Sequence, residues 1–200
     1  MSLNVLIIAE DIRYDQYMIA PIIRGMMKRL NQPTAKVLCC QDPRFRGYAQ
    51  ATDWERLLSR VFGRYQQVDA FVLCVDRDGE AGRDDALRAL ETKAEQVGIR
   101  LFATAAHQEL EAWVLAGCKA FKPTDYSFES WQAVRADRDV KERAFEPYAI
   151  ASGASQGPGG GRMRLGEEAG RLYASRVRRK CAELQRLEDR MGAWLATRSA

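Results

Sequence analysis

Four short apolar runs alternate with helix-forming segments in the first half of the chain, and this alternation constrains the fold more than any other feature. None of the runs alternates regularly between apolar and polar residues, which indicates strands that are buried on both faces of a sheet. The runs are Leu3–Ala9, Ala35–Cys40, Asp69–Val75 and Ile99–Thr104. We therefore predict an α/β fold with a mostly parallel sheet and helices on both of its faces.

Segments with apolar residues at helical spacing connect and follow these runs. The predicted helices are Asp15–Leu30, Asp53–Tyr65, Glu80–Val97 and one that starts at Gln108. After Cys118 the pattern weakens into short helical pieces and a glycine-rich segment, and Arg164–Ala196 is then predicted to form one long helix. We expect three parts, namely an α/β core (1–120), a mixed helical and glycine-rich segment (121–161) and a basic C-terminal helix packed on the core (162–200).

Composition is that of a folded globular protein, with 46% hydrophobic and 29% charged residues in 200. No apolar run approaches the roughly 18 residues that cross a bilayer, so we expect no membrane association. The first residues lack signal-peptide features and the five cysteines form no CxxC pair, which favours reduced thiols in a cytoplasmic protein. The net charge of +4 is concentrated after Gly161, which suggests a polyanionic partner, although a solvated amphipathic helix explains it almost as well.

Acidic residues follow three of the four predicted strands. Glu10 follows the first strand, Asp76 and Asp78 follow the third, and Glu109 and Glu111 come soon after the fourth. Because sites in parallel sheets form beyond the carboxyl ends of the strands, we expect these acids at one rim. The side chains of Asp76 and Asp78 would converge if strand geometry continued that far. Gathered carboxylates repel one another and need a cation, and oxygen-only ligands favour Mg²⁺ or Mn²⁺.

A purely structural explanation of these acids remains open. The sequence Asp-x-Asp-Gly is also common in turns, and acids at helix N-termini are favoured by the helix dipole. The metal interpretation requires that Glu10 lie near Asp76 and Asp78, and that arginines do not already neutralise these carboxylates.

The order of the acids resembles the Toprim pattern, in which one strand ends in glutamate and a later strand ends in Asp-x-Asp. The segment ELEAWVLAG (109–117) also resembles a signature of a Toprim-related family of small bacterial proteins, akin to the nuclease Toprim domains of the overcoming-lysogenisation-defect family. The similarity covers residues 3–117. It implies that the catalytic residues are Glu10, Asp76, Asp78 and Glu109, and that the metal ligands are these four and Glu111.

One departure concerns the loop after Glu10. The nuclease-type families usually have glycine next and a second acid four residues after the glutamate. Here Asp11 replaces the glycine, Tyr14 stands at the four-residue spacing and Asp15 comes one step later. Either the loop carries an insertion or the second metal position is altered.

The resemblance implies a Mg²⁺- or Mn²⁺-dependent nuclease that hydrolyses phosphodiester bonds of DNA or RNA. Such a protein would act in a bacterial phage-defence or DNA-maintenance system, with an ATPase as a partner. Glu10 would be a metal ligand or the general base. Arg162 and Arg164 follow the glycine-rich segment and are candidates to contact the scissile phosphate. A flexible linker followed by the start of an ordinary basic helix would give the same sequence pattern.

Two other functions compete with this hypothesis. A catalytically degenerate Toprim-like subunit would bind nucleic acid or protein without cleaving. The segment VLIIAED with a later aspartate also resembles the receiver domains of signalling proteins, in which Asp76 would accept a phosphoryl group. A receiver needs a lysine at the end of a fifth strand, and no such strand is predicted.

Overall fold

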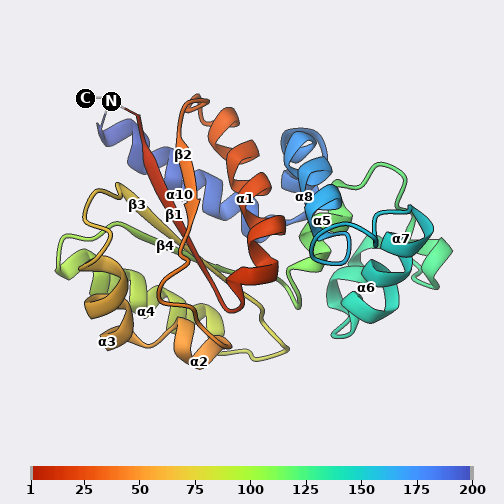
Figure 1. The fold of residues 1–200 in the computed structure, drawn as a ribbon, viewed down its shortest axis with the longest axis horizontal. Helices are drawn as coiled ribbons and strands as arrows, with labels where there is room; N and C mark the ends of the chain where they lie inside the picture. Colours follow the sequence, from red (N-terminus) through yellow and green to blue (C-terminus); the bar gives the residue numbers. More distant parts are fainter. Residues whose placement is uncertain (1, 199–200) are drawn as a thin grey trace.

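The computed structural model describes residues 2–198, which contain one four-stranded parallel sheet in the order β2-β1-β3-β4 (Figure 1). The strands are β1 (Asn4–Ala9), β2 (Lys36–Cys39), β3 (Ala70–Val75) and β4 (Leu101–Ala105). Each strand overlaps one of the four predicted apolar runs, and all three pairings are parallel. The predicted α/β class with a parallel sheet is therefore confirmed.

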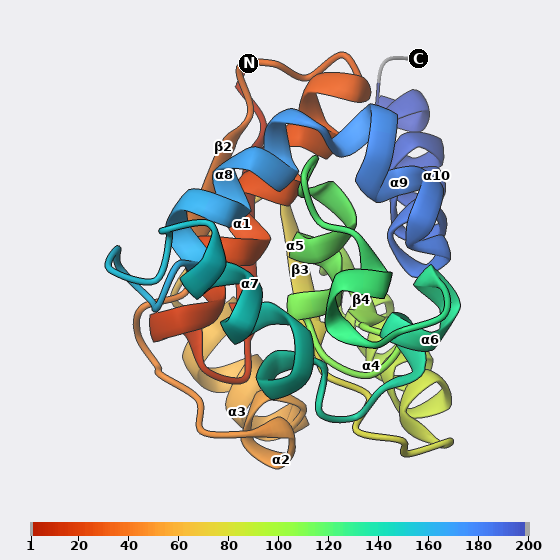
Figure 2. The ribbon, with the colours of Figure 1, turned by 90° about the vertical axis from the view of Figure 1, so that its right-hand side faces the viewer.

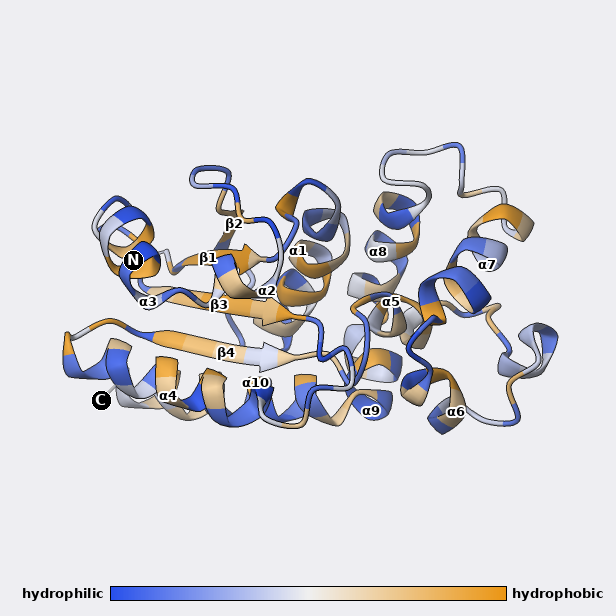
Figure 3. Cartoon of the chain, turned by 90° about the horizontal axis from the view of Figure 1, so that it is seen from below, coloured by the Kyte–Doolittle hydropathy of each residue, from blue (hydrophilic) through white to orange (hydrophobic). Residues whose placement is uncertain are grey.

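Both faces of the sheet are covered over β1, β3 and β4, which explains why these strands are almost entirely apolar (Figures 1 and 3). The edge strand β2 is only partly covered, with Lys36 and Leu38 exposed, so the prediction that it is buried on both faces is wrong. Successive side chains of a strand point to opposite faces. In β1, Val5 and Ile7 belong to the core on one face, whereas Leu6 and Ile8 belong to the core on the other. Helices α1, α5, α8 and α10 contribute to the first core, and the segments 57–62 and α4 contribute to the second.

The helices vary widely in length. They are α1 (Ile12–Arg29), α2 (Tyr48–Ala51), α3 (Trp54–Arg56), α4 (Arg83–Gln96), α5 (Glu111–Gly117), α6 (Trp131–Ala136), α7 (Glu146–Ala151), α8 (Arg162–Arg171), α9 (Arg178–Lys180) and α10 (Ala182–Arg198). A 3₁₀ turn at Pro123–Tyr126 and π-helical turns at Leu57–Phe62, Lys141–Phe145 and Tyr173–Val177 lie between them. Within residues 2–198, every helix is too short or too polar to cross a membrane.

The expectation of one helix over Arg164–Ala196 is wrong. Helix α8 ends at Arg171, a π-helical turn and α9 follow, and the extended backbone of Cys181 separates them from α10. A straight helix of that length would measure about 50 Å and would leave much of its apolar face in solvent. Instead the break lets α10 pack along β4, where it buries Leu184, Leu187 and Met191 (Figure 2).

Close packing of α8 on α1 fixes the start of α8 near the carboxyl edge of the sheet (Figure 2). Gly166 and Gly170 lie against the α1 backbone at Tyr17 and Pro21, where an added methyl group would overlap carbonyl oxygens. The two helices therefore approach more closely than larger side chains would allow. This contact holds Arg162, the first residue of α8, beside the loops that follow the strands.

Candidate functional site

A chain of hydrogen bonds joins the loops that follow β1, β3 and β4. The backbone N–H of Asp76 donates to Glu10 Oε1 at 3.0 Å. Asp76 in turn uses Oδ1 to accept the backbone N–H of Leu110 at 2.7 Å. The Arg77 N–H also donates to the Gln108 carbonyl oxygen, which ties the same loops together. The acids that follow the three strands therefore meet at one rim, as the order of the apolar runs predicted.

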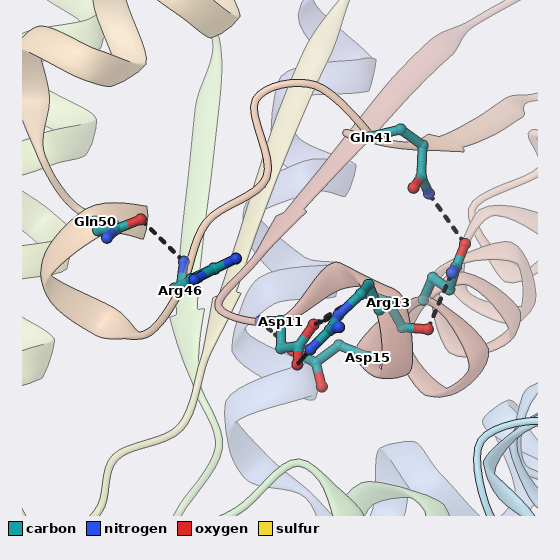
Figure 4. Close-up of polar contacts among 7 residues, drawn as sticks. Asp11, Arg13, Asp15, Gln41, Arg46 and Gln50 are labelled. Atoms are coloured by element: carbon teal, nitrogen blue, oxygen red, sulfur yellow. Dashed lines mark hydrogen bonds and ion pairs between the residues drawn. The ribbon is translucent and has the colours of Figure 1, made fainter.

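Asp15 lies in this group, although sequence analysis did not include it among the site residues. Asp11 caps α1 by accepting the Arg13 backbone N–H, and Asp15 follows one turn later on the same helix. Its Oδ2 accepts the Asp11 backbone N–H at 3.0 Å, as Figure 4 shows. The neighbouring Tyr14, which has the spacing of the family's second acid, is 47% exposed. Asp15, and not Tyr14, is therefore the residue of this loop that lies with the acids of the rim.

Four carboxylates, Glu10, Asp15, Asp76 and Glu111, form what we call the acidic cluster. Burial and repulsion from Glu111 and Asp15 raise the pKa of Asp76 well above its usual range. Burial, followed by repulsion from Glu111, Asp11 and Glu10, raises the pKa of Asp15 to about 7. Burial also raises the pKa of Glu10. The cluster therefore holds negative charge at an energetic cost, which is typical of functional sites.

The side chains of Asp78 and Asp76 point in different directions, so the expectation that they converge is wrong. Strand β3 ends at Val75, and Asp78 and Gly79 have positive φ angles of 50° and 73°. This turn directs Asp78 to Arg83, whose Nη1 lies 2.8 Å from Asp78 Oδ2. Asp78 is 52% exposed, and it lies outside the acidic cluster.

Arg83 is the cation closest to Glu10, and sequence analysis missed it. Its guanidinium lies 3.8 Å from Glu10 Oε1 and donates to the Asp76 carbonyl oxygen. The same group stacks on the Tyr48 ring, 4.1 Å from the centroid. No motif in the sequence connects Arg83 with these residues, because they follow three different strands or loops. Arg83 therefore lies between Glu10 and Asp78 and neutralises part of their charge.

Glu111 and Glu109 both have partners at the rim. Glu111 is buried and forms an ion pair with Arg162, which also lies 5.2 Å from the Phe145 ring. Glu109 Oε2 accepts the backbone N–H of Lys141 at 2.8 Å, and burial raises the pKa of Glu109 to about 7. Both acids of the ELEAW segment are thus close to the rim, but Glu111 already has a cationic partner.

The two predicted phosphate-binding arginines have different positions. Arg162 reaches the acidic cluster through Glu111. Arg164 donates to the Ser152 carbonyl oxygen at 3.2 Å and is exposed, and its contact with a phosphate stays a prediction. Residues 162 and 164 point in different directions because they lie about 200° apart around a helix.

The donor set of the cluster suits a hard divalent cation, because all of its side-chain ligands are carboxylate oxygens. A cation would also offset the repulsion that raises the pKa values of Asp15 and Asp76. Within residues 2–198, no three His, Cys, Asp or Glu side chains are already gathered in a metal-binding arrangement. Three of the predicted ligands are instead paired with arginines, since Arg83 contacts Glu10 and Asp78 and Arg162 contacts Glu111. The requirement that arginines leave these carboxylates free is therefore not met at these three residues.

Comparisons with protein-family models, with curated proteins and with solved structures found no match.

Proposed function

We propose that the protein is a Toprim-like nuclease that hydrolyses phosphodiester bonds with the help of Mg²⁺ or Mn²⁺. The observation that carries the proposal is the acidic cluster, in which Glu10, Asp15 and Asp76 repel one another at the carboxyl edge of the sheet. Buried carboxylates of like charge are costly unless a cation neutralises them. The order of these acids along the chain, with the ELEAW segment after them, supports the same function.

Glu10, Asp15 and Asp76 are the residues that would hold the ion. When bound, a divalent ion would polarise a phosphoryl oxygen of the substrate. Glu10 Oε1 accepts the Asp76 N–H, and the Tyr48 backbone N–H is also hydrogen-bonded to the Glu10 carboxylate, so two backbone donors hold this side chain in place. Arg162 is positioned to approach a substrate phosphate if its ion pair with Glu111 opens. Glu109, with a pKa of about 7, can hold or release a proton near neutral pH.

A degenerate, non-cleaving subunit is the second candidate, and one observation favours it. Arg83 and Arg162 already neutralise Asp78 and Glu111, as arginines would in a site that has lost its metal. Such a protein would still bind nucleic acid or a protein partner. The geometry does not support the receiver-type function, because Oδ1 of Asp76, the predicted phospho-acceptor, already accepts the Leu110 N–H.

Two measurements with one set of variants test the proposal. Mn²⁺ binding is measured by electron paramagnetic resonance, and cleavage of labelled single-stranded DNA, duplex DNA and RNA is measured in Mg²⁺ or Mn²⁺. The variants are Asp15→Asn and Asp76→Asn, which keep side-chain volume, and Glu129→Gln is the control because Glu129 is an exposed acid that does not belong to the acidic cluster. We expect both aspartate variants to lose cleavage by at least 100-fold and the control to retain it.

Equal cleavage by the wild type and Asp76→Asn would indicate a contaminating nuclease and would refute the proposal. Binding of nucleic acid without metal binding or cleavage would support the degenerate subunit. The ATPase partner stays a prediction, and co-expression with ATPases encoded beside the gene is its test.

A further inference from the structure

A hollow of about 600 Å³ lies beside the acidic cluster, between the start of α1 and the loop that follows β2. We call it the arginine hollow. Its lining residues are Asp11, Ile12, Arg13, Arg44, Phe45, Arg46 and Gly47. Three arginines against one aspartate give it a formal charge of about +2. Figure 4 shows Arg46 extending from its loop toward the first turn of α1, where Asp11, Arg13 and Asp15 lie.

Two of these arginines are available to bind a ligand. Arg44 and Arg46 are exposed, and neither guanidinium has an ion-pair or hydrogen-bond partner within residues 2–198. Only the backbone N–H of Arg46 is engaged, by Gln50 Oε1 at 3.1 Å. Arg13 instead pairs with Asp11 at 3.2 Å. The hollow thus presents free positive charge next to carboxylates that repel one another.

The loop that carries Arg44 and Arg46 is anchored at several points. Phe45, between the two arginines, is only 3% exposed and packs into the core. The Gly47 N–H donates to the backbone carbonyl oxygen of Glu10 at 3.2 Å, and the positive φ of Gly47 (82°) allows this turn. The arginines are therefore held at a defined place relative to Glu10, which reduces the entropy lost on binding.

The basic C-terminal segment offers much less free charge than its composition suggested. Many of its cations are used in contacts within the fold. These pairs are Arg162–Glu111, Arg178–Glu188, Arg190–Glu91 and Arg198–Asp69. Arg176 also donates to the Cys118 carbonyl oxygen. The charge asymmetry of the sequence therefore does not identify the anion-binding surface, whereas unpaired arginines at the rim do.

We propose that the arginine hollow binds the sugar-phosphate backbone of a nucleic acid strand and directs it to the acidic cluster. The inference rests on the proposed function, because the acids define where the strand must pass. Arginine guanidinium groups match phosphate geometry and position nucleic acids without reading sequence. Tyr14, which is 47% exposed, lies between the hollow and the acidic cluster, with the guanidinium of Arg13 5.4 Å and that of Arg162 5.8 Å from its ring centroid.

The test measures binding separately from cleavage. Fluorescence anisotropy with labelled 20-nucleotide single strands and duplexes is carried out in EDTA, so that no divalent ion contributes. The test variant is Arg44→Gln/Arg46→Gln. The matched control is Arg171→Gln/Arg179→Gln, which removes the same charge from exposed arginines of the C-terminal segment. Thermal unfolding confirms that both variants are folded.

We expect the test variant to bind at least tenfold more weakly than the wild type and the control to change less than twofold. Loss of two phosphate contacts should also reduce the slope of log K against log salt by about 1.4 for single strands and about 1.8 for duplexes. Wild-type affinity in the test variant would overturn the inference. So would equal weakening by both pairs, or a wild type that binds no nucleic acid.

The outcomes separate this inference from the proposed function. Arginine-dependent binding by a protein that never cleaves would refute the nuclease and leave the hollow as a nucleic-acid surface. Metal-dependent cleavage that is unaffected by Arg44→Gln/Arg46→Gln would refute the hollow and leave the nuclease.

Discussion

Replacing Asp15 by asparagine should make the metal-free protein more stable at pH 8. The ordinary pKa of this carboxyl is 3.8, and in the folded protein it is about 7 because of burial and repulsion from Glu111. The folded state therefore binds the proton more tightly than the unfolded state. The stabilising effect of that proton is complete below pH 3.8 and is lost as the pH rises to 7, so above pH 7 the charged carboxylate destabilises the fold.

The size of the effect follows from the difference between these two pKa values. A difference of about 3.2 corresponds to about 4 kcal/mol, which is an upper limit because Glu10, Asp76 and Glu111 share the repulsion. An asparagine at this position would keep an oxygen that accepts the Asp11 N–H. We therefore expect Asp15→Asn to raise the free energy of unfolding by about 1 to 3 kcal/mol at pH 8.

Urea unfolding at pH 8 and pH 5, in EDTA and in 10 mM Mg²⁺, measures this effect. The gain of Asp15→Asn should be largest in EDTA at pH 8 and smaller at pH 5, where the wild-type carboxyl is protonated. Mg²⁺ should stabilise the wild type more than the variant, and Glu129→Gln should show neither effect. The reasoning is refuted if Asp15→Asn is no more stable than the wild type at pH 8, or if its gain is equal at both pH values.

Three further predictions concern the same rim and its support. Arg83→Gln should tighten Mn²⁺ binding by about three- to tenfold, since it removes the cation that is paired with Glu10; unchanged or weaker Mn²⁺ binding in paramagnetic resonance would contradict this. Mn²⁺ affinity should rise between pH 6 and pH 8, because Asp15 has a pKa of about 7 and binds metal only when ionised; a flat titration would contradict it. Gly166→Ala should lower the free energy of unfolding by about 2 kcal/mol or more, because the added methyl group overlaps the α1 backbone. A free energy of unfolding in urea equal to that of the wild type would contradict this, since it would show that α1 and α8 can move apart without loss of stability.

The strands could be predicted from the sequence because their signal is local. Apolar runs such as Asp69–Val75 are buried wherever they lie in a sheet, and parallel order places the residues after them at one edge. Glu10 and Asp76 were found at that edge for this reason. The continuous helix over Arg164–Ala196 was wrong because helical spacing does not report the break at Cys181, which depends on packing against β4.

The contacts of the site were decided by tertiary structure. Asp15 joined the acidic cluster because the first turn of α1, capped by Asp11, places it beside the loops that follow β1 and β3. Arg83 reached Glu10, and Arg162 reached Glu111, across large separations in sequence. Hydrophobic burial acts on a few consecutive residues and leaves a pattern in the chain, whereas an ion pair requires only that two distant side chains meet. The sequence by itself therefore determined which edge of the sheet gathers acids, and the packing of helices and loops decided which of them are neutralised.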